Sequence, residues 1–379
     1  MFLIIISPKI VFLSVEEKIY KIAVSILQGI GIVNTKTLLA YVGGPKAVFE
    51  ISEKEIAKRC DISIQKVKKF NRKAALKRAE EEIVFMETNN IQLHYYQDEN
   101  YPAALKFCED SPIVLFSKGN VNFNQQNISI VGTRKASSYG IKIAKQFVKD
   151  LAPRGVQIIS GLAHGIDKTA HEAALTNGLS TIAVLGHGLD LIYPAANKQL
   201  ARLLQDTGGL VTEYLSKTPG DPGNFPQRNR IVAGLSEATV VIESAISGGS
   251  LITANLAFGY SREVFAFPGN IDRTNSAGCN NLIQRNTAKL ITTADDMVAA
   301  LGWEEIDTES SENQTDLFEA HTVDEDKIIT ALKTENKATH IDFLTKVTTM
   351  TASEISLHLF NLEMRGSIQS LPGKMYQLT

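Results

Sequence analysis

The residues best suited to binding a ligand lie in glycine-rich segments, each directly after a short apolar run. The first segment contains Gly132, Thr133 and Arg134. Gly132 lets the backbone turn sharply out of a strand, and a helix expected to begin near residues 137–139 would point free N–H groups at that turn. Arg134 adds a guanidinium group that can bind a phosphate through two parallel hydrogen bonds. The segment therefore predicts a phosphate-binding loop; the alternative is that Gly132 only serves a tight turn.

The second segment contains Gly161, His164, Gly165 and Asp167. Its two glycines allow a ligand to approach the backbone closely, and His164 could contact a nucleotide. Asp167 is expected to cap the N-terminus of the helix that follows. A lone histidine also serves as a structural hydrogen-bonding group, so both interpretations of His164 stay open.

The third segment combines an aromatic ring with cations. Phe225 precedes Arg228, Asn229 and Arg230 in a stretch expected to form a helix. This combination holds single-stranded nucleic acid, because bases stack on the ring while the cations neutralise phosphates. The alternative is a helix whose arginines form ion pairs with nearby glutamates.

Two further segments share the pattern with less specific chemistry. Ser247, Gly248, Gly249 and Ser250 place glycines and hydroxyls at an expected helix N-terminus. Such an end suits an anion, although the same residues would also serve a plain helix cap. Tyr193 follows another glycine-flanked strand exit, where inward packing is as reasonable as ligand contact. One small phosphate needs one such helix end, so several on one edge indicate an extended polyanion.

Short apolar runs define the elements that must position these segments. The runs alternate with helix-length stretches and occupy residues 128–131, 156–159, 181–185, 210–212, 239–242 and 263–267. Near-continuous apolar strands that alternate with helices predict a parallel sheet covered on both faces, hence an α/β fold with a Rossmann-like core. Ligands of such sheets bind at the carboxyl ends of the strands, where the segments described above begin.

Dinucleotide binding and hydrolytic chemistry are both disfavoured. The first turn lacks the G-x-G-x-x-G pattern, and the acidic residue at the expected ribose-binding distance, Asp150, falls inside a likely helical stretch. Residues 244–262 contain neither Asp nor Glu, so a general acid or base after the last glycine-rich turn is missing. Glu213 and Glu243 stand at strand ends without a paired base. We therefore predict a non-enzymatic protein with no catalytic residues and no cofactor.

Composition and charge set the broad class. The 379 residues are 44% hydrophobic and 21% charged, as in ordinary soluble proteins. The three cysteines share no C-x-x-C spacing, so we expect neither a disulfide framework nor a metal site. This cysteine usage fits a reducing compartment. Ten of the 41 acidic residues and none of the 39 basic ones fall within 304–326, so an acidic stretch masks a mildly basic body. The apolar N-terminus lacks a basic start and a cleavage site, which predicts a cytoplasmic protein without a membrane partner.

The pattern divides the chain into five parts. They are an N-terminal tail (1–14), a helix-hairpin-helix or SAM-like helical domain (15–90), a Rossmann-like core (91–303), an acidic linker (304–323) and a winged-helix domain (324–379). The helical domain carries a glycine turn at Gly29 and Gly31 that could present N–H groups to DNA phosphate, and a protein-interaction role is equally open. The helix expected at residues 351–365 holds one arginine, which indicates a protein contact more than a duplex reader.

Four segments, 130–134, 160–167, 225–231 and 247–254, resemble the hallmark blocks of the DprA/Smf family in order and spacing. The resemblance covers about residues 105–301. It implies an extended Rossmann fold, homodimerisation through that fold, and sequence-independent binding of single-stranded DNA. It also implies loading of RecA recombinase onto incoming DNA in natural transformation.

The resemblance further implies that Arg134 contacts DNA phosphate and that Phe225 contacts bases. Some family members carry a DNA-contacting lysine shortly before that aromatic residue. Here residues 221–224 contain none, and Lys217 lies further back. Two alternatives remain: a nucleotide phosphoribohydrolase of the LOG type, and a protein-interaction scaffold whose core glycines are structural.

Overall fold

The apolar runs predicted as strands fold as neighbours in one parallel arrangement within the unit Met1–Gly302. They form β3 (Asn127–Gly132), β4 (Gln157–Ser160), β5 (Thr181–Val184), β6 (Gly209–Thr212), β7 (Ala238–Ile242) and β8 (Glu263–Ala266). Their order is β6-β5-β4-β3-β7-β8, and each neighbouring pair is parallel. The chain winds in opposite directions from β3 and from β7, which makes their boundary the switch point where such sheets bind ligands.

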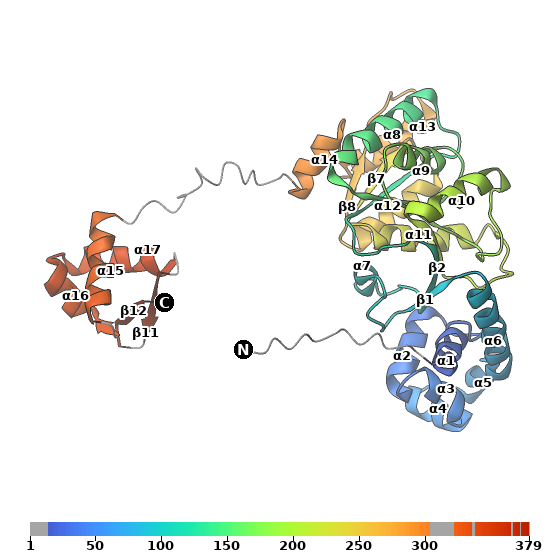
Figure 1. Ribbon diagram of the computed structural model, residues 1–379, viewed down its shortest axis with the longest axis horizontal. Coiled ribbons are helices and arrows are strands. Elements are labelled where there is room, and N and C mark those ends of the chain that lie inside the picture. The colour runs from blue at the N-terminus through green and yellow to red at the C-terminus, as the bar shows by residue number, and fades with distance from the viewer. Residues whose placement is uncertain (1–13, 304–321, 336–337, 365–366, 372, 379) are drawn as a thin grey trace, which may run out of the picture. The chain divides into compact units, whose positions relative to one another are not determined.

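The computed structural model describes residues 14–303, 322–335, 338–364, 367–371 and 373–378. Most of the predicted tail and acidic linker lies outside these residues, and their assignments stay predictions. The chain divides into two compact units, Met1–Gly302 and Trp303–Thr379 (Figure 1). Among the described residues, no helix combines the length and the apolar character that crossing a membrane requires.

Three short strands extend the sheet at its two edges. The segment before the core supplies β1 (Gln92–Tyr95) and β2 (Val114–Gly119), and β2 pairs antiparallel with β6. At the other edge β9 (Lys289–Leu290) pairs parallel with β8.

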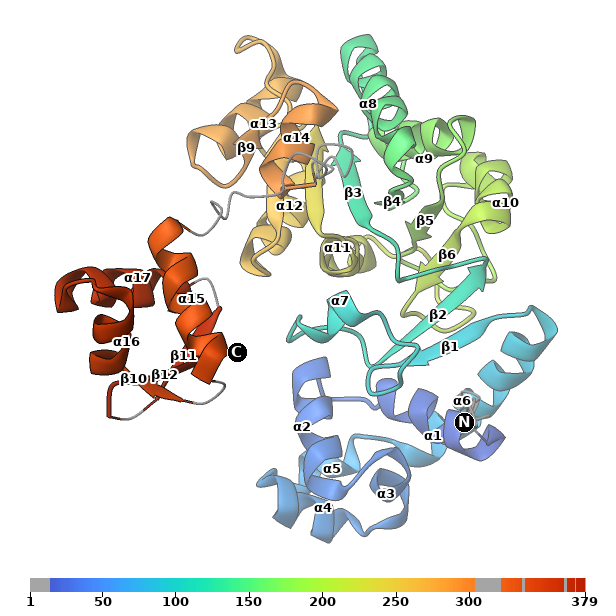
Figure 2. The same ribbon diagram turned by 60° about the vertical axis from the view of Figure 1, so that its left-hand side comes forward.

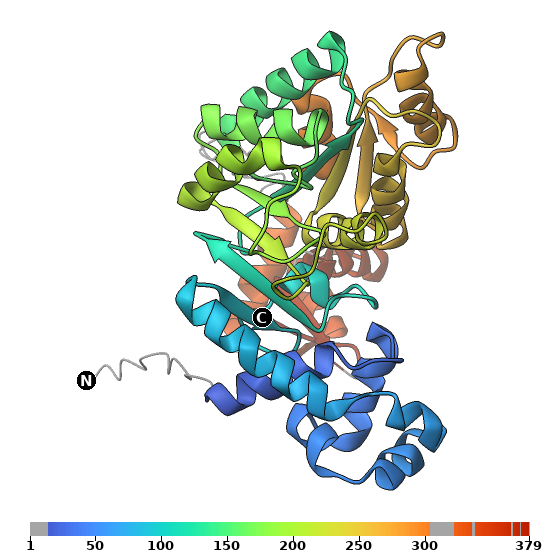
Figure 3. The ribbon, with the colours of Figure 1, turned by 90° about the vertical axis from the view of Figure 1, so that its right-hand side faces the viewer.

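Helices cover both faces of this sheet, as Figure 3 shows from the side. One layer contains α8 (Ser138–Leu151), α9 (Ile166–Thr176) and α10 (Lys198–Thr207); the other contains α11 (Asn224–Leu235) and α12 (Gly249–Gly259). Strands β4, β5, β6 and β7 are buried along their whole length, as expected for a sheet covered twice. The remaining helical elements of the core are α7 (Ala103–Lys106), η1 (Ala152–Arg154), η2 (Ala195–Asn197), α13 (Thr274–Gln284) and α14 (Ala294–Leu301).

The N-terminal helices pack on the β1 edge of the sheet. They are α1 (Val15–Ser25), α2 (Ile32–Val42), α3 (Pro45–Glu50), α4 (Glu53–Cys60), α5 (Ile64–Lys68) and α6 (Arg72–Thr88). The expected glycine turn joins α1 to α2, with Gly29 at φ +74° and Gly31 as the N-cap of α2. One apolar cluster runs from Ile22 and Phe70 in the helices to Phe116 in β2. The helical domain and the core therefore share a hydrophobic interior.

The second unit is a winged helix. It contains α15 (Val323–Glu335), β10 (Thr339–His340), α16 (Ile341–Thr348), α17 (Ala352–Met364), β11 (Ile368–Leu371) and β12 (Met375–Leu378), drawn in red in Figure 2. The last two strands pair antiparallel and form the hairpin of the winged helix. Its core, built around Ile328, Leu344 and Leu359, is a cluster of its own.

Candidate nucleic-acid interface

The loops that leave β3, β4 and β7 meet beside the switch point and enclose a hollow of about 480 Å³ with the first turns of α11 and α12. Gly132 packs so closely that a Cβ atom there would lie 2.0 Å from the Ile242 carbonyl oxygen. The Thr133 N–H donates to the Glu243 carbonyl at 2.8 Å. Only glycine at position 132 lets these two loops touch, so its role in shaping the site is structural.

Arg134 extends over the aromatic part of this hollow. Its guanidinium carbon lies 5.6 Å from the centroid of the Phe225 ring. Phe225 in turn stacks on Tyr193, with the ring centroids 5.6 Å apart and the planes at 28°. Arg134 and Tyr193 are exposed, and Phe225 is half-buried. An accessible cation beside two stacked rings offers phosphate neutralisation and base stacking together.

Hydrogen bonds within the loop after β5 fix the main chain at Tyr193. The Tyr193 N–H donates to His187 Nε2 at 3.2 Å, and His187 Nδ1 then donates to the Gly188 carbonyl at 2.9 Å. Burial lowers the pKa of His187, so the neutral ring that makes both bonds is favoured. A Cβ atom at Gly186 would lie 2.9 Å from the Phe225 ring, so the glycine makes room for it.

Arg228 does not present an exposed cation, which corrects the sequence prediction. The residue is 4% exposed, and its Nη1 donates to the Gly161 carbonyl at 2.6 Å and to the Val184 carbonyl. A Cβ atom at Gly161 would lie 2.5 Å from that nitrogen. Burial lowers the pKa of Arg228 to about 10, which leaves it charged at neutral pH. Arg228 therefore ties the ends of β4 and β5 together and adds a buried positive charge beneath the hollow.

Arg230 needs the same correction. Its Nη2 lies 2.6 Å from Glu213 Oε2, and both side chains are largely buried. Burial raises the pKa of the Glu213 carboxyl, and the Arg230 charge opposes this rise. The ion pair that the sequence allowed as an alternative forms in the structure, and a DNA contact by Arg230 stays a prediction.

The capping prediction for Asp167 is wrong, because α9 begins at Ile166 and its N-cap is Gly165. Gly165 has φ +76°, and a Cβ atom there would lie 2.2 Å from the Thr133 carbonyl oxygen. Asp167 is buried and accepts weak hydrogen bonds from the Gly161 N–H at 3.2 Å and the Ala163 N–H at 3.4 Å. Burial raises the pKa of Asp167, opposed first by the Arg228 charge. Asp167 thus shapes the β4 loop from inside.

The glycine pair after β7 opens α12 toward the hollow. Gly248 is the N-cap and Gly249 the first residue of the helix. The Asn229 Nδ2 donates to the Gly249 carbonyl at 3.4 Å, which links the starts of α11 and α12. Ser250 is buried and donates to the hydroxyl of Ser244 at 2.8 Å. The eleven-residue helix α12 therefore directs the positive end of its dipole toward the hollow.

Most of the residues singled out in the sequence line this hollow. They are Gly132, Thr133, Arg134, Gly161, Asp167, Phe225, Arg228, Asn229, Gly248, Gly249 and Ser250. His164 lines a smaller adjoining hollow together with Arg134 and Phe225. Within the described chain, Gly165, Arg230 and Ser247 line neither of them.

Tyr193 and Ile252 are among the lining residues outside the predicted set. For Tyr193 the sequence supports packing and ligand contact equally. Ile252 is 42% exposed although it belongs to an apolar helix. An apolar residue in an expected helix normally packs in the core, so its position carried no signal.

The carboxylates at the strand ends, Glu213 and Glu243, make structural hydrogen bonds and ion pairs. The Glu243 side chain accepts the Ser137 N–H at 2.8 Å and the Ser137 hydroxyl at 2.5 Å, which fixes the turn before α8. Among the described residues, no group of three or more His, Cys, Asp or Glu could hold a metal ion. The arrangement is suited to binding an anion that carries flat rings.

A second hollow, of about 730 Å³, lies over α8, α9 and α10. Lys145, Lys149 and Lys168 line it together with aliphatic side chains such as Leu203. The strand-end hollow remains the better candidate, because it combines an arginine, stacked rings and helix N-termini at the switch point.

The fold and the site together define a class of protein. It is an extended Rossmann-like α/β protein with an attached winged helix, and the strand-end loops form an aromatic surface suited to a polyanion. A family model for DNA recombination-mediator protein A matches residues 92–302, and one for the DprA winged helix domain matches residues 313–374. Protein Smf of Escherichia coli is 36% identical over 309 residues, which cover 80% of this chain and 81% of Smf. The chain therefore belongs to the DNA recombination-mediator protein A (DprA/Smf) family, which confirms the resemblance carried by the four segments.

Solved structures agree with this assignment. The X-ray structure of DNA processing protein A from Streptococcus pneumoniae matches with a TM-score of 0.63 at 33% identity, over 76% of this chain and 98% of that one. A DNA processing protein A structure from Helicobacter pylori, described for its single-stranded DNA binding mode, matches with a TM-score of 0.51 at 28% identity. That match covers 56% of this chain and 96% of the other.

Proposed function

We propose that this protein binds single-stranded DNA, without sequence preference, on the rim formed by the loops after β3, β4 and β7. The observation that carries the proposal is the stack in which exposed Arg134 lies over Phe225 and Phe225 lies over Tyr193. A phosphate would bind Arg134 and the helix N-termini, while a base stacks against the exposed ring faces.

Single strands fit this rim better than a duplex. Ring faces bind bases that are unstacked and unpaired, and paired bases hide their faces in the helix. The groups offered to the strand are a guanidinium, backbone N–H groups and rings, and these do not distinguish one base from another. The Helicobacter pylori relative, described as binding single-stranded DNA, supports the same assignment for this chain.

The finer role that we propose is delivery of single-stranded DNA to RecA recombinase during DNA uptake and recombination, by a homodimer formed through the Rossmann-like core. The family's description as a recombination mediator supports delivery to a recombinase. A cytoplasmic setting suits this role and suits three free cysteines, two of them buried. The winged helix is then available for a protein contact.

Fluorescence anisotropy with labelled single-stranded and duplex DNA over a salt series tests the proposal. We expect a preference for the single strand, and Arg134→Ala should weaken its binding by about 1–3 kcal/mol. The slope of log K against log salt should fall by about 0.7, the value for one phosphate contact on a single strand. Arg202→Ala is the matched control, since Arg202 is an exposed arginine on α10. Salt-insensitive binding would overturn the proposal, and release of free base from a nucleoside monophosphate would favour the phosphoribohydrolase alternative.

A further inference from the structure

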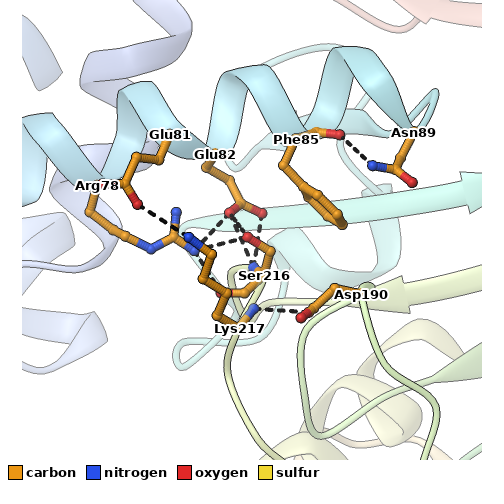
Figure 4. Close-up of polar contacts among 8 residues, drawn as sticks. All are labelled: Arg78, Glu81, Glu82, Phe85, Asn89, Asp190, Ser216 and Lys217. Atoms are coloured by element: carbon orange, nitrogen blue, oxygen red, sulfur yellow. Dashed lines mark hydrogen bonds and ion pairs between the residues drawn. The ribbon is translucent and has the colours of Figure 1, made fainter.

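A buried polar cluster joins the helical domain to the loop after β6 (Figure 4). Glu82 of α6 is 2% exposed, and its carboxylate accepts the Ser216 N–H at 3.0 and 3.1 Å and the Ser216 hydroxyl at 2.6 Å. Arg78, one turn earlier, donates through Nη2 to Glu82 at 2.8 Å and to the Ser216 carbonyl at 2.6 Å. Two charged side chains of α6 thus grip both backbone polar groups of one loop residue.

The next loop residues are held both by α6 and by the loop after β5. Lys217 has φ +64°, and its N–H donates to Asp190 Oδ1 at 2.9 Å. The Lys217 ammonium also lies 3.6 Å from Glu81 of α6 (Figure 4). The Thr218 carbonyl accepts the Gly188 N–H at 3.1 Å. The segment from Ser216 to Thr218 is therefore fixed between α6 and the loop that carries Tyr193.

This anchored segment leads directly to the aromatic part of the proposed DNA site. Only residues 219–224 separate it from Phe225. A Cβ atom at Gly220 would lie 3.4 Å from the Tyr193 ring and 3.5 Å from the Phe225 ring, so this stretch packs against the stack. A displacement of the anchor would pass through a short, packed segment to the start of α11.

Only the Glu82 side chain of this ion pair is fully buried, since 26% of the Arg78 side chain is exposed. Burying a carboxylate is costly and offsets much of the attraction within the pair. Here Glu82 and Arg78 both form hydrogen bonds with the backbone of Ser216, which lies 134 residues after Glu82 in the sequence. We propose that Glu82, supported by Arg78, is a positioning residue of the single-stranded DNA site: it holds the loop that places Phe225, without touching DNA. This inference rests on the function proposed above.

The test is Glu82→Gln in the full chain, which keeps the side-chain volume and one acceptor but removes the charge. Hydrogen exchange at residues 216–224 should accelerate, by about tenfold for the amides that Glu82 and Asp190 hold. Affinity for single-stranded oligothymidylate should fall about three- to tenfold, a range typical of coupling through packed residues. In a Phe225→Ala background the same substitution should change affinity by less than about twofold, because the group it positions is gone. Glu80→Gln, on the exposed side of α6, is the matched control.

Ser216→Ala keeps the inference testable should Glu82→Gln fold poorly. It removes the hydroxyl's hydrogen bonds with Glu82 and with Arg78 Nη2 and leaves the main chain intact. It should change exchange and affinity in the same direction. The inference is overturned if Glu82→Gln, folded as judged by circular dichroism, binds like wild type while Phe225→Ala binds weakly. It is also overturned if Glu82→Gln weakens binding equally with and without Phe225. Failure of the wild-type protein to bind single-stranded DNA would instead refute the proposed function, and the exchange result would still report on the anchor.

Discussion

At the residue scale, the proposed DNA site combines one accessible arginine with two aromatic rings, and each kind of group would make a different contribution to binding. Arg134 supplies charge, whereas Phe225 and Tyr193 supply flat apolar surface. These two contributions respond differently to salt, since ions screen charge but leave stacking almost untouched. Substitutions at the two kinds of residue should therefore be distinguishable.

Phe225→Ala should weaken binding of single-stranded DNA by about 1–3 kcal/mol, the contribution of one stacked base, with little change in the salt slope. Phe225→Trp should retain most of the affinity, because the stacking face is preserved. Anisotropy titrations at several salt concentrations measure both quantities. A salt slope that falls as much as in Arg134→Ala would contradict this division of roles.

The buried histidine His171 should make the free energy of unfolding depend on pH. The Thr181 hydroxyl donates to the Ile158 carbonyl, so His171 Nδ1 must donate to Thr181 Oγ1 at 2.7 Å. Burial lowers the pKa of His171 from 6.5 to about 3, and among the described residues Nε2 has no partner. As the pH falls, His171 therefore becomes protonated near pH 6.5 in the unfolded chain, but only near pH 3 in the folded chain. The free energy of unfolding should fall as pH drops through this window, by up to about 1.4 kcal/mol per pH unit.

Urea unfolding at about pH 7, 6 and 5 measures this slope. His171→Asn is the comparison, since its amide can still donate to Thr181 but does not titrate. The difference between the two proteins should shrink as pH falls. Parallel pH profiles would show that His171 does not contribute.

At the element scale, the strand-end loops are held by one another as much as by the strands that precede them. The β3 loop contacts the β7 loop at Gly132, and the β4 loop contacts the β3 loop at Gly165. Arg228 adds a link from α11 to the ends of β4 and β5. A substitution that distorts one of these loops should therefore destabilise the neighbouring loops as well.

Gly165→Ala tests this dependence. Its φ of +76° is a conformation that alanine avoids, and the new Cβ would lie 2.2 Å from the Thr133 carbonyl oxygen. We expect a loss of at least about 1–3 kcal/mol in unfolding free energy, measured by denaturant titration, and weaker DNA binding. Gly259→Ala is the control, since a Cβ there meets nothing within 4 Å in the described chain and should not destabilise. Equal stability of the two variants would contradict the prediction.

At the scale of the whole molecule, the two units have separate hydrophobic cores. The cluster around Ile328, Leu344 and Leu359 belongs to the winged helix, whereas the helical domain shares its interior with the sheet. Separate hydrophobic cores can unfold independently, whereas a shared core unfolds as one. The helical domain and the Rossmann-like core should thus behave as a single cooperative body.

Calorimetry of the full chain should show two transitions, the smaller from the winged helix. Removing residues 304–379 should abolish the smaller transition and shift the larger midpoint by no more than a few degrees, about the effect of 1 kcal/mol in a unit of this size. A separate third transition for the helical domain, or a large shift on truncation, would contradict this division.

The strands, their parallel pairing and the sheet edge that carries the candidate site could be predicted from the sequence, because they follow from local patterns. Apolar runs followed by glycine occur wherever a buried parallel strand ends, and each of the six predicted runs became a strand of one sheet. The glycine-rich segments directly after the strands, together with the family blocks, predicted that Gly132, Arg134, Gly161 and Phe225 lie at one edge, and all four line the same hollow.

Only the tertiary structure decided which cations face outward. Arg134, Arg228 and Arg230 look alike in sequence, yet the first is exposed, the second ties two strand ends together, and the third pairs with Glu213. Their fates depend on carbonyls and carboxylates from elements far away along the chain. The grip of Glu82 on Ser216 has the same origin, since long-range contacts leave no trace in local periodicity. Local pattern sets where the chain is extended, helical or turned, and the balance of burial and pairing in three dimensions sets what each charged group does.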